Sequence, residues 1–231
     1  MTKKKFTLIL DTETSCDERA ADFAAIVVDR TGTIHAQCAV LVAGVYGSVE
    51  LFHNSDDGLW GSAGLIKRKQ AYAEMLNSGV RMLASPLAIN RWLDKAIGTY
   101  NPEVTAYNFD FDRRICENTG IDLSGFKNSF CLWQAAVGNI CDTKAYRQFA
   151  LEHHLFNPPT DKGNMTFRTD AEAVAGFVKG SLEKEPHTAL IDCTDFERPI
   201  LTHILRRKHW RDNMIKYSWS AHQVRDHFKA K

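Results

Sequence analysis

The sequence lacks any apolar run that could span a membrane. No window approaches the roughly 18 uninterrupted apolar residues of a transmembrane helix, so we expect no membrane partner. The apolar stretch after the N-terminal lysines is only about five residues long and runs directly into Asp11, which predicts no signal peptide. A cytoplasmic location is the expectation that follows.

Metal-binding cysteine pairs are also missing. The six cysteines are widely and irregularly spaced and none forms a C-x-x-C pair, so no zinc site is indicated. Without a secretion signal, reduced thiols are favoured over disulfides.

Internal repeats, low-complexity runs and linkers are absent as well, which favours one domain over 1–208 followed by a tail over 209–231. The stretch 198–231 holds nine Lys or Arg and two Asp, a local charge of +7 in a chain of net +1. The body is therefore mildly acidic, at about −6. A polyanion partner and a solvated helix face are equally compatible with this basic tail.

The remaining sequence predicts an α/β fold. Three strand-like runs joined by short connections predict an antiparallel meander, and two later strands are each followed by helices. We therefore expect a mixed five-stranded sheet, with parallel strands beside the meander and helices on its faces. The predicted strands are 5–11, 22–30, 33–43, 104–108 and 128–135; the predicted helices are 66–79, 86–100, 112–120, 143–154, 169–180 and 187 to 208, with a loop over 54–64.

The first candidate motif is LILDTETS, in which an apolar strand ends in two acids. Residues i and i+2 of a strand point to the same face, so Asp11 and Glu13 project together. Two such like charges repel each other, and a hard divalent cation is their natural partner. A solvated pair of acids at the end of the strand is the alternative.

The second candidate is AYNFDFDRRI, which follows the fourth strand. Asp110 and Asp112 lie just beyond an apolar strand, where open α/β sheets bind their ligands. Asp112 would equally serve as the N-cap of the next helix.

The third candidate is PHTALIDC. His187 and Asp192 are five residues apart, which on an α-helix separates them by about 140°. Both can reach one cleft if His187 precedes the helix and Asp192 lies within it; a purely structural histidine is the alternative. Asp195 and Glu197 are interpreted as surface charges. They are the alternative carboxylates if Asp192 does not serve the site.

In this order along one α/β chain, the three motifs resemble those of the DEDDh 3′–5′ exonucleases, a family that includes polymerase proofreading subunits and RNase T. The resemblance covers about residues 5–205 and implies an RNase H-like fold. It departs from the family at Tyr107, where a His is frequent, and in the additional Asp110. It implies two Mg²⁺ or Mn²⁺ ions held by Asp11, Glu13, Asp112 and Asp192, with His187 as general base.

For such an enzyme we expect hydrolysis of phosphodiester bonds from the 3′ end of single-stranded nucleic acid, with DNA favoured over RNA. Two metal ions would stabilise both ends of the in-line displacement. Residues beside the motifs are the expected substrate contacts, although core packing is the alternative for Phe109 and Phe111. The contacts predicted are Thr12, Thr14, Asn108 and Phe111.

Other interpretations remain at this point. An exoribonuclease would use the same five residues, and a catalytically silent nucleic-acid-binding module would use the same fold. An aspartate-based phosphotransferase is disfavoured, because Glu13 occupies the place of its second Asp and PHTALIDC has no role in it. A homodimer and a polymerase or replication partner are further expectations from the resemblance.

Overall fold

The computed structural model describes residues 5–54, 61–159, 163–215 and 224. These residues build a six-stranded mixed sheet with the strand order β4-β3-β2-β1-β5-β6. The first three strands pair antiparallel, and the other pairings are parallel. The strands are β1 (Phe6–Thr14), β2 (Ala20–Asp29), β3 (Ile34–Val42), β4 (Leu83–Ala84), β5 (Glu103–Ala106) and β6 (Ser129–Cys131).

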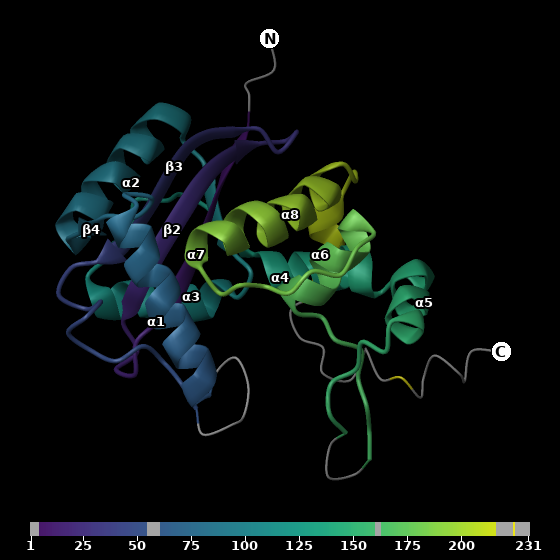
Figure 1. Ribbon diagram of the computed structural model, residues 1–231. Coiled ribbons are helices and arrows are strands. Elements are labelled where there is room, and N and C mark those ends of the chain that lie inside the picture. The colour runs from purple at the N-terminus through teal and green to yellow at the C-terminus, as the bar shows by residue number, and fades with distance from the viewer. Residues whose placement is uncertain (1–4, 55–60, 160–162, 216–223, 225–231) are drawn as a thin grey trace.

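The helices divide between the two faces of this sheet (Figure 1). Helices α1 to α3 pack on the face that carries Leu8 and Leu10, whereas the later helices pack on the face that carries Ile9 and Ile26. The helices are α1 (Ser62–Asn77), α2 (Pro86–Tyr100), α3 (Phe109–Thr119), α4 (Leu132–Ala136), α5 (Lys144–Glu152), α6 (Ala171–Lys179), α7 (Ala189–Ile191) and α8 (Arg198–Leu205), with the π-helices η1 (Val137–Cys141) and η2 (Asp192–Glu197) and the 3₁₀ helix η3 (Trp210–Asn213).

The predicted α/β class, the meander and the flanking helices are confirmed, but the strand count is wrong by one. The additional strand, β4, consists of two residues at the outer edge of β3, too few to produce an alternating pattern. The strand predicted over 128–135 is also too long, because it gives way to α4 after Cys131. A short apolar run of this kind fits a buried helix as well as a strand.

Helix α2 matches its prediction at both ends because local signals fix its boundaries. Ser85 caps it by accepting a hydrogen bond from the Ala88 amide, and Pro86 occupies the first turn. Asn101 ends it in the left-handed conformation.

The helix predicted from 187 to 208 runs from Ala189 to Leu205 and is not α-helical throughout. It comprises α7, the π-helix η2 and α8, so that a wide turn beginning at Asp192 interrupts the regular α-helix. The predicted loop over 54–64 is too long, because α1 begins at Ser62; residues 55–60 lie outside the described residues.

The first part of the predicted tail packs against the sheet domain. Trp210 is buried with its ring 5.0 Å from that of Phe130, and Asn139 donates a hydrogen bond to the Trp210 carbonyl. Residues 216–223 and 225–231, with most of the basic and aromatic positions, lie outside the described residues. All six cysteines are free, and no helix of the described chain is long and apolar enough to cross a bilayer.

A glycine substitution tests the contact between η1 and Asn213, the last residue of η3. A Cβ at Gly138 would lie 1.5 Å from the Asn213 carbonyl oxygen, whereas a Cβ at Gly98 in α2 would meet nothing within 4 Å. We expect Gly138→Ala to lower the free energy of unfolding by about 1–3 kcal/mol or more. Gly98→Ala, the matched control, should raise it by about 0.5–1 kcal/mol. Urea denaturation of both variants measures this, and equal stabilities would contradict the close packing at Gly138.

Candidate active site

Strand β1 supplies the first two acids at the centre of the sheet. Its neighbours are β2 and the parallel strand β5, so the carboxyl ends of β1 and β5 meet at one edge. Asp11 and Glu13 follow Ile9 at two-residue intervals and therefore share its face, which α6 to α8 cover. The predicted common direction of the two carboxylates agrees with this register.

Helix α3 brings the third acid to this edge. Asn108 is its N-cap residue, and Asp112 lies in its first turn, so the alternative of Asp112 as N-cap is wrong. Asp112 is buried and its Oδ1 accepts a 2.8 Å hydrogen bond from the Thr12 hydroxyl. Asp110 is exposed and lies 3.7 Å from Arg113, which leaves Asp112 as the carboxylate that faces inward.

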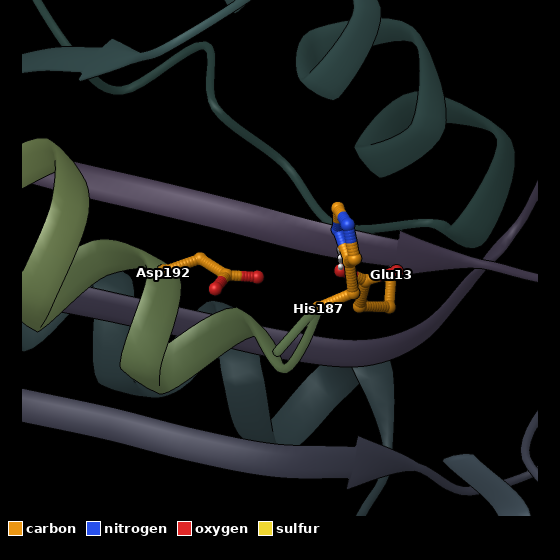
Figure 2. Close-up of side chains that lie close together, drawn as sticks. All are labelled: Glu13, His187 and Asp192. Carbon is orange, nitrogen blue, oxygen red and sulfur yellow. Dashed lines mark ion pairs between the residues drawn. The ribbon is translucent and has the colours of Figure 1, made fainter. Parts of the chain in front are cut away.

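The third segment approaches from the opposite side of the sheet. His187 precedes α7 with a left-handed backbone (φ +53°), and Asp192 begins η2. The His187 Nδ1 lies 3.8 Å from Glu13 Oε1. Figure 2 shows the Asp192 carboxylate directed toward the Glu13–His187 pair, and the three residues each offer one ligand atom within 4.8 Å of the others.

A buried ion pair beneath this segment holds it against β2. Asp22 is fully buried, and its Oδ2 accepts a 3.1 Å hydrogen bond from the Ala189 amide at the start of α7. Its other oxygen lies 3.7 Å from Nε of the buried Arg81. The start of α7, and with it the His187 loop, is thereby tied to the strand that pairs with Glu13.

One cavity of about 520 Å³ is lined by the acids of all three segments and by His187. A volume of this size is typical of small-ligand sites. All nine residues predicted for catalysis, metal binding or substrate contact line it: Asp11, Thr12, Glu13, Thr14, Asn108, Phe111, Asp112, His187 and Asp192. Phe109, by contrast, is buried in the core, whereas Phe111 is 37% exposed at the cavity.

Four further acids line the cavity: Glu18, Asp170, Glu185 and Glu197. None of them was predicted as a site residue, and Glu197 was named only as a reserve for Asp192. Glu197 was predicted to be a surface charge and is 1% exposed, whereas Asp195 is exposed as expected. The prediction failed because five residues along an α-helix turn the side chain by about 140°. In η2 the hydrogen bonds span five residues, so Glu197 returns to the side of Asp192. Phe52, 42% exposed at the cavity, was also not predicted.

Burial and mutual repulsion raise the pKa values of the clustered acids. Burial raises the pKa of Glu13 to about 8, that of Asp112 to about 7 and that of Asp192 to about 10. The pKa of Asp11 is raised well above its ordinary value by burial and then by the charges of Asp112 and Glu197. These shifts mean that the carboxylates cannot all ionise together without a compensating cation.

His187 shows the opposite shift. Burial, reinforced by the positive charge of Arg68, lowers its pKa below the ordinary value of a histidine. The imidazole is therefore neutral at pH 7, and it has a nitrogen available to accept a proton.

The carboxylates fit a divalent cation by their donor atoms and by their lack of other partners. Among the described residues, Asp11 Oδ2, Asp192 Oδ1 and Glu197 Oε2 are buried without a hydrogen-bond partner. Buried charged oxygens without partners are costly, and carboxylate oxygens are the ligands that Mg²⁺ and Mn²⁺ prefer. Glu13, His187 and Asp192 are thus able to hold a metal ion.

Comparison with known proteins adds no relative: no family model, curated protein or solved structure matches this chain.

The raised pKa values predict how stability depends on pH when divalent cations are absent. A carboxyl group with a raised folded-state pKa stabilises the fold below its unfolded pKa of about 4, and this contribution is lost as pH rises through the folded values. We therefore expect the Tm in EDTA to fall between about pH 5 and about pH 9. Adding Mg²⁺ should raise the Tm more at the upper end of this range.

Asp192→Asn isolates the contribution of one of these acids. The variant should raise the Tm in EDTA at about pH 8 by a few degrees, roughly 2–4 °C per kcal/mol for a chain of this length. Asp195→Asn, an exposed neighbour on the same turn, should leave the Tm unchanged. An Asp192→Asn protein that is no more stable than the native protein in EDTA would contradict the predicted repulsion.

Proposed function

We propose that this protein is a metal-dependent 3′–5′ exonuclease that hydrolyses phosphodiester bonds from the 3′ end of single-stranded nucleic acid, with DNA as the favoured substrate. The proposal includes an RNase H-like fold. The observation that carries it is the convergence of three distant segments: Asp11 and Glu13, Asp112, and His187 with Asp192 all line one cavity. The resemblance of these segments to the DEDDh exonucleases supplies the reaction.

The carboxylates would hold two Mg²⁺ or Mn²⁺ ions, with Asp11 between them. Glu13 and Asp192 would complete the ligands of one ion, since their oxygens already lie within 4.8 Å of each other. Asp112 would serve the other. When bound, the ions supply a nucleophilic water and stabilise the charge on the leaving 3′ oxygen.

His187 would accept the proton from the attacking water. Its imidazole is neutral at pH 7 and stands beside Glu13 at the cavity, which suits a general base. Asp22 would hold the His187 loop in place through the Ala189 amide.

Two exposed aromatic rings at the cavity would bind the terminal nucleotide. Phe111 and Phe52 line it from different segments, and Arg114 lies 5.4 Å over the Phe111 ring. Stacking on such rings tolerates any base, as expected for an exonuclease that removes successive nucleotides. Thr12, Thr14 and Asn108 line the same cavity and would contact the sugar and phosphate.

The proposal is tested with 5′-labelled single-stranded DNA and RNA of matched sequence, incubated with Mg²⁺, Mn²⁺ or EDTA. We expect a ladder that shortens from the 3′ end only when a divalent cation is present, and faster on DNA. His187→Asn should reduce the rate by about 10²–10⁴-fold, the usual contribution of a general base. Asn tolerates the left-handed backbone at this position, so the loss can be assigned to the imidazole.

Asp110→Asn is the matched control, because Asp110 is exposed two residues before Asp112. It should retain the native rate, whereas Asp11→Asn and Asp112→Asn should lose activity. Faster RNA degradation would reassign the chain as an exoribonuclease. Binding of the single-stranded DNA or RNA without metal-dependent cleavage would instead identify a silent nucleic-acid-binding module and refute the exonuclease.

A further inference from the structure

Glu197 is a buried acid in the cavity to which none of the three motifs gives a role. It is the last residue of η2 and is 1% exposed. Its Oε1 accepts a 2.8 Å hydrogen bond from the amide of Tyr107, the residue directly after β5. Its Oε2 is buried and has no hydrogen-bond partner among the described residues.

A buried carboxyl group of this kind needs a compensating charge in order to ionise. Within the described chain, no lysine, arginine or histidine forms an ion pair with Glu197; the buried Arg81 pairs with Asp22. Leaving a charged oxygen desolvated and unpaired is strongly unfavourable. Glu197 lines the same cavity as Asp11 and Asp112, so its nearest charged groups are also acids.

The acids of the cavity fall into two groups. Glu13, His187 and Asp192 form one group, with ligand atoms within 4.8 Å of one another. Asp11, Asp112 and Glu197 line the same cavity outside this group, and Asp11 Oδ2 and Glu197 Oε2 are both buried without a hydrogen-bond partner among the described residues. With Asp11 shared, Glu13 and Asp192 would give the first cation three carboxylates, whereas Asp11 and Asp112 alone would leave the second cation with only two.

We propose that Glu197 is a fifth carboxylate ligand of the site, holding the second divalent cation together with Asp11 and Asp112. This inference rests on the two-cation hydrolase proposed above and deepens it. The hydrogen bond from Tyr107 fixes one oxygen of Glu197 and leaves the other to face the cation. The wide turn of η2 makes this possible, because it returns Glu197 to the side of Asp192.

The alternative is that Glu197 only anchors the end of β5 through the Tyr107 amide. Glu197→Gln separates the two roles, because glutamine keeps the acceptor oxygen and the shape but loses the charge. Glu197→Ala removes both. Asp195→Asn is the control, since Asp195 is exposed on the same turn.

The test is Mn²⁺ binding without substrate, measured by electron paramagnetic resonance and calorimetry on the full chain. The native protein and Asp195→Asn should each bind two ions. Glu197→Gln should bind one ion with native affinity and the second roughly tenfold more weakly or worse. Its Tm in EDTA should be at least that of the native protein, and raised Mn²⁺ should restore part of any nuclease activity.

Two native-affinity sites in Glu197→Gln would overturn the inference, and so would a native protein that binds fewer than two Mn²⁺ ions. If only Glu197→Ala weakens binding, Glu197 is an anchor for Tyr107 and the inference also fails. The proposed function fails separately: a native protein that binds two ions and loses one in Glu197→Gln, yet cleaves neither DNA nor RNA, supports the ligand and refutes the exonuclease.

Discussion

The repulsion among buried carboxylates at the carboxyl edge of β1 is the constraint around which this molecule is built. Asp11, Glu13, Asp112, Asp192 and Glu197 share one cavity, and burial raises the pKa of every one of them. Such a cluster lowers the stability of the fold at neutral pH unless cations occupy it. The rest of the domain therefore has to hold these acids together against a force that separates them.

The positions of the acids depend on rigid elements on both sides of the sheet. Asp11 and Glu13 lie on the central strand β1, and its neighbour β2 is buried along its entire length. Neither strand can therefore shift easily. Asp112 is held by Thr12 across the sheet edge, and the His187 segment is held by the Ala189–Asp22 hydrogen bond. Asp112 and the Asp192 segment are thus fixed by contacts to β1 and β2, and Glu197 is fixed by the Tyr107 amide directly after β5.

Much of this arrangement follows from patterns that can be read in the sequence. Alternation along β1 is enough to place Asp11 and Glu13 on one face, and the signals at Ser85 and Pro86 mark the start of α2. Glu197 and β4 could not be predicted in this way. A π-turn depends on tertiary packing and leaves no distinct spacing in the sequence, and β4 exists only because β3 offers an edge to two residues.

The wide turn of η2 also sets the rotational phase of the helix that continues beyond it. Asp192 and Glu197 face the cavity, whereas Ile200, Leu201 and Ile204 of α8 pack in the core. A chain with one residue fewer in this turn would keep the His187 loop but rotate everything after it by about 100°. The apolar face of α8 would then leave the sheet. The single added residue therefore allows one helix to direct Asp192 and Glu197 into the cavity and the apolar residues of α8 into the core. A regular α-helix of the same sequence would not place both sets correctly.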